Sequence, residues 1–178
     1  MSNAPRIKSV ARRLLILVSA GLALAGCGAV HKMLGGEARA DLAGAWRSQV
    51  QFSSGALASF HDLQFMYVFN RGGTLTESSN YDGAPPVPPA YGAWKKTGRH
   101  AYEARYEFYV TKPPAQLQDL AGGGGWLPAG RGVLTESIVL SADGRTFTSK
   151  IAYQGLDTLG KPTPDAGAAV GQGVRIGF

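Results

Sequence analysis

Two glutamates lie in the same four-residue sequence, Leu-Thr-Glu-Ser, at residues 75–78 and 134–137. Side chains alternate between the two faces of an extended strand, so Glu77 and Glu136 each share a face with neighbouring leucines. If those faces point into a core, the carboxyl groups lose hydration, which is costly and raises their pKa values. Such carboxyl groups suit acid–base chemistry or recognition of a polar ligand. The alternative, which we favour, places both at a rim, where water or an arginine compensates the charge.

Aromatic side chains fall on the same inward faces that we predict for the strands. The set comprises Trp46, Trp94, Tyr67, Tyr102, Tyr106, Phe108, Phe147 and Tyr153. As the lining of a cavity, these rings would hold an apolar ligand, and the tyrosine hydroxyls would fix its orientation. The candidate ligand contacts are Trp94, Tyr67, Tyr102, Tyr106, Phe108 and Tyr153. As a filled core, which we prefer by a small margin, the rings need no ligand, because an eight-stranded barrel is narrow.

Other residue types offer little chemistry. His31, His61 and His100 do not have the spacing of zinc ligands, and we expect no metal and no cofactor. The nucleophile-elbow, phosphate-loop and dinucleotide-binding motifs are absent from the sequence. The glycine run at residues 122–125 lacks the lysine and helix that follow in a phosphate-binding loop. We therefore expect a protein that is not an enzyme, with catalysis by Glu77 or Glu136 as the minority hypothesis.

The elements that must position these side chains are β-strands. Residues 100–110 show the strand pattern most clearly, because Tyr102, Tyr106 and other apolar residues alternate with charged ones. This alternation is typical of a strand with one buried face. The Asp143-Gly144 pair indicates a tight hairpin. Short turns between successive strands favour one antiparallel up-and-down barrel, with a sandwich as the alternative. The strands are expected near residues 44–52, 63–70, 73–79, 90–97, 100–110, 132–141, 146–154 and 172–178.

Two irregular stretches interrupt this pattern. Residues 80–90 contain four prolines, and residues 111–131 contain a Pro-Pro pair, the glycine run and Trp126. Loops of such length inside a compact domain are uncommon unless they are functional or disordered. We expect these two stretches to be loops that contact a ligand or a partner, with at most one helical turn at residues 116–120.

The N-terminus has the composition of an export signal. Four basic residues within residues 6–13 precede an apolar run at 14–24, which is too short to span a bilayer. The following Leu24-Ala25-Gly26-Cys27 resembles the bacterial lipobox. That resemblance implies cleavage after residue 26 and acylation of Cys27, and two or three acyl chains anchor a protein durably to a membrane. Residues 1–26 are thus the expected signal, 27–41 a flexible tether and 42–178 the barrel domain.

The same resemblance implies a location. Many lipoproteins of Gram-negative bacteria that remain in the inner membrane have aspartate after the cysteine, whereas this chain has Gly28. We therefore expect an outer-membrane protein facing the periplasm, or one on the outer face of the plasma membrane in a host without an outer membrane. In either case the membrane is a partner through the acylated cysteine.

Charge and cysteine content narrow the classes further. The formal net charge is +6, but the leader holds four of the 18 basic residues and none of the 12 acidic ones, so the mature chain is near +2. A basic footprint for nucleic acid is missing. Cys27 is the only cysteine, so an intramolecular disulfide is excluded and stability must come from the core.

Gly44 and Trp46 at the start of the first expected strand, with Arg175 in the last, resemble the calycin group, which includes the lipocalins. In that group the arginine packs over the tryptophan and helps to close the barrel, so the resemblance gives these three residues a closure role. The turn at 69–74, the second Gly-x-Trp at 92–94 and the segment 141–147 also resemble a group of small exported bacterial barrel proteins. This second resemblance implies a lipocalin-like barrel and no particular activity.

Three functions remain open from the sequence. The first is an envelope lipoprotein whose barrel binds or carries an apolar or amphipathic small molecule. The second is a structural or accessory protein with a filled core, which acts on an envelope protein through residues 80–90 and 111–131. The third and weakest is a small barrel isomerase or cyclase that uses Glu77 or Glu136. An open cavity lined by the aromatic residues would favour the first function.

Overall fold

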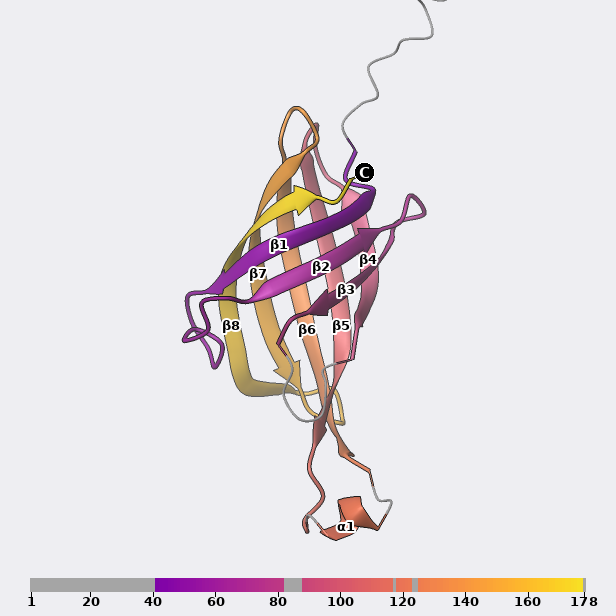
Figure 1. Ribbon diagram of the computed structural model, residues 1–178, viewed down its shortest axis with the longest axis vertical. Coiled ribbons are helices and arrows are strands. Elements are labelled where there is room, and N and C mark those ends of the chain that lie inside the picture. Colours follow the sequence, from indigo (N-terminus) through magenta and orange to yellow (C-terminus); the bar gives the residue numbers. More distant parts are fainter. Residues whose placement is uncertain (1–40, 82–87, 117, 123–124, 178) are drawn as a thin grey trace, which may run out of the picture. The chain divides into compact units, whose positions relative to one another are not determined.

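The barrel domain is all-β. The computed structural model describes residues 41–81, 88–116, 118–122 and 125–177, in which eight antiparallel strands close into a barrel in chain order (Figure 1). The strands are β1 (Gly44–Phe52), β2 (Gln64–Phe69), β3 (Thr74–Ser79), β4 (Ala90–Lys96), β5 (Ala101–Lys112), β6 (Leu127–Leu140), β7 (Thr146–Leu156) and β8 (Pro162–Arg175). The single-turn helix α1 (Gln118–Ala121) lies between β5 and β6. The expected fold class is confirmed, and the expected signal and lipidation site, Cys27, lie outside the described residues.

The first and last strands close the barrel. Trp46 of β1 pairs with Tyr67 of β2 on one side and with Arg175 of β8 on the other. Every described strand therefore has two hydrogen-bonded neighbours in the barrel wall. Within the part of the chain that the structure describes, no helix is long and apolar enough to cross a membrane.

The last strand corrects the expected boundaries. Residues 172–178 were expected to form it, but β8 begins at Pro162 and ends at Arg175. Its first ten residues are mostly small or polar and include two prolines, so they lack the alternation of large apolar residues that marks a strand. The inward positions of β8 are small because side chains from other strands fill the space: a Cβ at Gly173 would collide with the Phe147 ring, and one at Gly171 with the Ser149 hydroxyl.

The expected loop at residues 111–131 is also shorter than predicted. Strand β5 continues to Lys112 and β6 begins at Leu127, so the β5–β6 hairpin extends beyond the ends of the other strands (Figure 1). The register shifts between Val110 and Thr111, which marks a bulge where the hairpin leaves the barrel wall. Proline and glycine in this segment hid its strand character.

The two ends of the barrel differ. We call the end where β1 begins, with the turns near residues 70–73, 97–100 and 141–145, the closed end. The opposite end, where β1 finishes at Phe52 and the β5–β6 hairpin projects, is the open end. Aromatic rings fill the closed half, with ring centroids 5.1 Å apart for Trp46 and Phe147 and 5.9 Å apart for Phe69 and Trp94. Truncating a buried ring of this kind costs about 3–5 kcal/mol, so these rings contribute substantially to stability.

Arg175 seals the closed end. Its guanidinium lies 4.2 Å from the centre of the Trp46 ring and donates hydrogen bonds to the backbone carbonyl oxygens of Gly144, Ala43 and Asp41. The Trp46 indole nitrogen in turn donates to the carbonyl of Leu42 over 2.8 Å. Gly44 has a φ of +136°, and a Cβ there would collide with the Arg175 guanidinium. These contacts fix the first strand to the last.

Candidate functional site

A cavity of about 250 Å³ lies at the open end of the barrel. Its lining comes from every strand except β4 and from the segments between β1 and β2 and between β3 and β4. Most of the lining is apolar: Phe52, Ala56, Leu57, Leu63, Phe65, Tyr81, Pro88, Phe108, Val110, Leu134 and Tyr153. The polar members are Glu77, Ser79 and Asp165. A concave apolar site with a few polar groups is the usual form of a small-molecule pocket.

The cavity wall contains a stacked aromatic pair. Phe108 of β5 and Tyr153 of β7 lie with their ring centroids 6.3 Å apart and their planes 15° from parallel. Gly132 of β6 lies between these strands, and a Cβ at this position would collide with both rings. The Tyr153 hydroxyl donates a 2.8 Å hydrogen bond to the Asp165 carboxylate. The absence of a side chain at residue 132 therefore allows one face of the cavity to be aromatic.

Glu77 supplies the only buried carboxyl group in this lining. It lies on β3 between Tyr67 of β2 and Ala90 of β4, and only 5% of its surface is exposed. Burial raises the pKa of Glu77 to about 8, and the nearby Glu136 carboxyl adds to the shift. Among the described residues, its Oε1 atom has no hydrogen-bond partner. Glu77 is therefore mostly protonated near neutral pH, and it retains an unused hydrogen-bonding atom.

Glu136 belongs to a polar cluster deeper in the barrel. The Tyr106 hydroxyl donates to its Oε2 atom over 2.9 Å, and the Tyr67 hydroxyl lies 3.4 Å from that of Tyr106. Burial raises the pKa of Glu136, although the hydrogen bond from Tyr106 acts in the opposite direction. Burial also raises the pKa values of both tyrosines well above their usual range, and Glu136 contributes to each shift. The cluster does not line the cavity, and the Oε1 atom of Glu136 has no hydrogen-bond partner among the described residues.

The favoured interpretation of the two glutamates is wrong. Neither Glu77 nor Glu136 lies at a solvated rim or pairs with an arginine, because both are buried at inward positions, where Tyr106 donates a hydrogen bond to Glu136. The ion pairs found among the described residues involve other acidic residues: Lys95–Glu103, Arg105–Glu107 and Arg131–Glu107. The sequence alternation placed the glutamates on the inward face correctly, but the cost of burying a carboxylate favoured the rim. Protonation removes most of that cost.

The six candidate ligand contacts separate into two groups. Phe108 and Tyr153 line the cavity, whereas Tyr67, Tyr102 and Tyr106 are fully buried in the core and Trp94 packs at the closed end. The Trp94 ring lies 5.7 Å from that of Tyr102, and its indole nitrogen donates to the backbone carbonyls of Asn70 and Thr74. The interior is therefore a filled core in its closed half and a cavity at its open end.

Several cavity residues were not among the candidates. Leu57 and Tyr81 come from irregular segments, which carry no periodic signal, and Asp165 comes from the part of β8 that was not recognised as a strand. Leu63, Phe65 and Leu134 are alternating apolar residues, so their inward direction was readable. The sequence did not indicate that these side chains leave part of the barrel interior unfilled.

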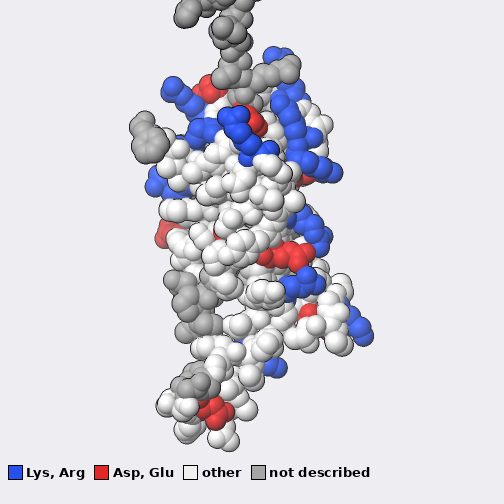
Figure 2. All heavy atoms as spheres, turned by 90° about the vertical axis from the view of Figure 1, so that its right-hand side faces the viewer, with Lys and Arg blue, Asp and Glu red and all other residues white. Residues whose placement is uncertain are grey.

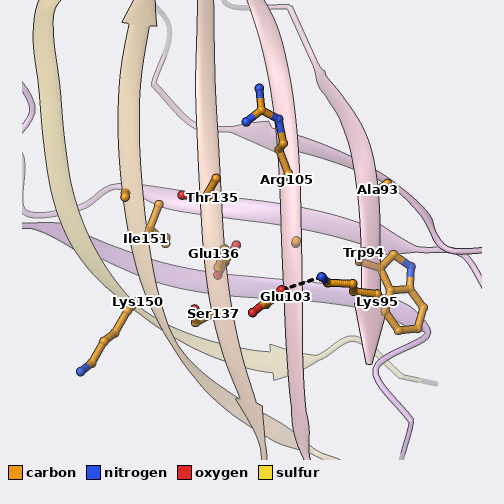
Figure 3. Close-up of a pocket in the computed structure, with 12 residues that line it drawn as sticks. Ala93, Trp94, Lys95, Glu103, Arg105, Thr135, Glu136, Ser137, Lys150 and Ile151 are labelled. Carbon is orange, nitrogen blue, oxygen red and sulfur yellow. Dashed lines mark ion pairs between the residues drawn. The ribbon is translucent and has the colours of Figure 1, made fainter. Parts of the chain in front are cut away.

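A second hollow, of about 600 Å³, lies on the outer surface across β4 to β7 (Figure 3). Small outward side chains form its floor, including Ala93, Thr135 and Ala152, and Lys95 and Glu103 pair across it at 3.0 Å. Glu136 borders this hollow through its strand, but its carboxyl group bonds to Tyr106 on the inner side. The hollow is a shallow, solvated surface with charged edges. We assign the candidate site to the interior cavity because only that cavity is enclosed by apolar side chains.

Charge is distributed unevenly over the surface. Lys and Arg side chains gather at the closed end (Figure 2), where the turns and strand ends carry Arg71, Lys96, Arg99 and Arg145. In the residues that the structure describes, no group of three His, Cys, Asp or Glu side chains is arranged to hold a metal ion. The cavity is thus an apolar site with acidic polar groups, set away from the basic end.

Comparisons of the chain with protein-family models, with curated proteins and with solved structures find no match. The chemistry of the cavity is therefore inferred from its own residues. Those residues offer an apolar volume, a buried carboxyl group with a free oxygen, and a hydrogen-bonded Tyr153–Asp165 pair.

Proposed function

We propose that this chain is a membrane-anchored envelope lipoprotein whose barrel binds a small, mainly apolar molecule in the cavity at its open end. The observation that carries the proposal is the cavity of about 250 Å³, walled by Phe52, Leu63, Phe65, Phe108 and other apolar side chains. Apolar surface left unfilled inside a barrel forfeits packing energy, and a ligand that occupies it recovers this energy. Carriage or sequestration of such a molecule follows from binding without chemical change.

The size of the cavity limits the ligand. Typical small-molecule pockets hold about 300–1,000 Å³, so a volume of about 250 Å³ suits a small compound or one end of a longer one. The closed half offers no further depth, because Tyr67, Tyr106 and Phe147 fill it. The expected ligand therefore places a ring or a short alkyl chain in the cavity.

The anchor is the second part of this proposal. The sequence Leu24-Ala25-Gly26-Cys27 supports cleavage before Cys27 and acylation of its thiol, with the barrel held at the outer membrane facing the periplasm. Mass spectrometry of the detergent-extracted protein tests this directly. We expect a chain that begins at Cys27 and carries acyl chains, and a Cys27→Ser variant that is released in soluble form or retains its leader. An unmodified Cys27 in the wild-type extract would overturn the anchor.

Neighbouring residues on β3 provide a sharp test of the cavity. Ser79 lines the cavity, whereas Ser78 is exposed on the outer face of the same strand. Ser79→Phe should fill the cavity, and Ser78→Phe places the same ring in solvent. We expect the neutral fluorescent probe N-phenyl-1-naphthylamine to bind to the wild type and to Ser78→Phe, and to bind at least tenfold more weakly to Ser79→Phe. Equal binding by both variants would place the probe elsewhere and remove the basis of the proposal.

Native mass spectrometry of protein extracted from its own envelope complements the probe. A retained small-molecule mass that disappears in Ser79→Phe supports the cavity as the binding site. A second protein in place of a small molecule supports the accessory function instead. The observation that favours this second candidate is the projecting β5–β6 hairpin, which exposes Tyr109 and Leu127 to solvent. Tyr109→Ser should abolish such a complex without changing probe binding.

An enzymatic role has less support. Glu136 is enclosed by the tyrosine cluster, so Glu77 is the one buried carboxyl group that a molecule in the cavity reaches. Acid–base catalysis of an isomerisation or cyclisation ordinarily requires a second positioned group to move or receive a proton. That a non-enzymatic binding protein fits best stays a prediction.

A further inference from the structure

The ionisable groups around the cavity are all acids or phenols. Glu77 and Asp165 are the carboxyl groups, and Tyr81 and Tyr153 supply hydroxyls. Among the described lining residues there is no Lys, Arg or His, and residues 82–87, which follow Tyr81 in the sequence, contain one aspartate and no basic residue. A ligand with a carboxylate or phosphate group would therefore meet two acids and no counter-charge. Such a group is expensive to bury without a partner.

The Oε1 atom of Glu77 indicates where a ligand can make a polar contact. It is buried in an otherwise apolar part of the lining and has no hydrogen-bond donor within the described residues. Leaving a buried polar atom without a partner costs about 1–3 kcal/mol, and a donor on a bound molecule removes that cost. The Tyr153–Asp165 pair is already satisfied internally, so Glu77 is the group with capacity to spare.

We propose that the cavity takes a lipophilic amine, with its apolar part against the Phe108 and Tyr153 rings and its nitrogen donating to the Glu77 carboxyl group. This proposal rests on the binding function proposed above and names the chemical class of its ligand. An ammonium group beside a carboxylate forms a charge-assisted hydrogen bond, which is about twice as strong as a neutral one. A carboxylate ligand of the same length can accept a hydrogen bond from the protonated Glu77 carboxyl group, but it buries a negative charge beside two acidic residues with no cation among the described lining residues.

Binding of an amine also moves a proton in a defined direction. Near neutral pH, the free protein holds a proton on Glu77 because burial raises its pKa to about 8. A free alkylamine enters as the ammonium ion, so formation of the ion pair requires the Glu77 proton to leave for the solvent. One proton is released for each ligand bound, and no bond in the ligand breaks. An alcohol that fills the same volume releases none.

A matched series of ligands tests the class. Octylamine, octanol and octanoate share one alkyl chain, and each is titrated at pH 7 against N-phenyl-1-naphthylamine bound to the full chain. We expect octylamine to displace the probe at up to about a tenfold lower concentration than octanol, because a hydrogen bond to a charged group contributes about 1.5–3 kcal/mol and ionising Glu77 at pH 7 offsets about 1.4 kcal/mol of it. Octanoate should be the weakest. Octanoate binding as tightly as octylamine would overturn the proposal.

Two variants distinguish the contribution of the Glu77 carboxyl group from that of Asp165. Glu77→Gln should bring octylamine and octanol to similar affinities while leaving octanol nearly unchanged, whereas Asp165→Asn should preserve most of the preference for the amine. Calorimetry of wild type in buffers with different ionisation enthalpies measures the released proton and does not depend on any variant folding. Zero proton release with octylamine at pH 7 contradicts the ion pair at Glu77.

The two proposals fail in distinguishable ways. If the probe binds and all three octyl compounds displace it equally, the binding function stands and the amine class is wrong. If neither the probe nor any octyl compound binds to folded wild-type protein, the binding function itself is wrong. Displacement by octylamine that Ser79→Phe does not weaken would show that the amine binds elsewhere, and would overturn the assignment to this cavity.

Discussion

The Tyr106 hydroxyl donates a 2.9 Å hydrogen bond to the Glu136 carboxyl group in the interior of the barrel. The Tyr106 hydroxyl in turn lies 3.4 Å from the Tyr67 hydroxyl. A carboxyl group in this position would otherwise be an isolated polar group among aromatic rings. The tyrosine contact is what makes an inward glutamate compatible with a stable core.

The first prediction concerns this hydrogen bond. Tyr106→Phe removes the donor to Glu136 and should lower the free energy of unfolding by about 1–3 kcal/mol, because a buried acceptor loses its partner. Tyr102→Phe is the matched control, since the Tyr102 hydroxyl is buried without a hydrogen-bond partner in the described residues. Urea unfolding monitored by circular dichroism measures both. Similar losses in the two variants would mean that the Tyr106–Glu136 contact contributes little.

The second prediction is a dependence of stability on pH. The folded chain holds the Glu77 proton up to about pH 8, whereas the unfolded chain releases it near pH 4.5. The folded state therefore binds more protons between these values, and the free energy of unfolding should fall as the pH rises from 4.5 through 8. The full shift corresponds to roughly 5 kcal/mol. Glu136, whose pKa is also raised, adds to the same trend.

Glu77→Gln isolates the contribution of one carboxyl group. Glutamine resembles the protonated acid and does not ionise, so this variant should show a flatter pH profile and exceed the wild type in stability at pH 9. The control Glu103→Gln removes an exposed carboxylate that pairs with Lys95 on the outer face and should leave the profile nearly unchanged. A Glu77→Gln profile that parallels the wild type would assign the pH dependence to other groups.

The third prediction concerns the glycine in the cavity wall. Gly132→Ala introduces a Cβ where the Phe108 and Tyr153 rings now lie, and at least one ring must move. Overpacking of this kind costs about 1–3 kcal/mol, and displacement of the rings should weaken probe binding. Gly72→Ala is the control, because nothing lies within 4 Å of its added Cβ. Unchanged affinity and melting temperature in Gly132→Ala would show that the rings rearrange freely.

The fourth prediction concerns the closed end. Arg175→Ala removes the contact with the Trp46 ring and three hydrogen bonds to backbone carbonyls, and we expect a loss of about 2–4 kcal/mol. Arg47→Ala removes an exposed arginine from β1 and should cost far less. Hydrogen exchange locates the effect: Arg175→Ala should increase exchange along the β1–β8 seam more than along β5–β6. A uniform increase would indicate loss of global stability alone.

Much of the fold was readable from the sequence because alternation is a direct consequence of a one-sided sheet. Tyr102 and Tyr106 alternate with Glu103 and Arg105, and β5 contains all four as expected. The part of β8 before residue 172 was not readable, because Gly167 and Gly171 leave their inward space to side chains from other strands. A strand whose inward residues must be small does not show the alternation of large apolar and polar residues by which a strand is recognised.

The sequence indicated which side chains of the candidate site point into the barrel, but not how far along the barrel axis each one lies. The sequence placed Phe108 and Tyr153 on inward faces together with Tyr67 and Tyr106, and nothing local distinguishes the two pairs. Their positions along the barrel axis do: the first pair lines the cavity and the second fills the centre. Depth depends on the strand registers, which the sequence does not specify residue by residue. The protonated state that permits Glu77 to be buried likewise emerges only from the assembled barrel.

The first described residue, Asp41, lies beside Arg175 at the closed end, opposite the cavity. If Cys27 is acylated, the 13 residues from 28 to 40 correspond to a chain length of at most roughly 45 Å between the lipid anchor and Asp41. The cavity would then open at the far end of the domain from the point of attachment. A molecule that enters the cavity from water must first dissolve as a monomer, which disfavours long, insoluble lipids. Short-chain amphiphiles that dissolve as monomers meet this transport condition.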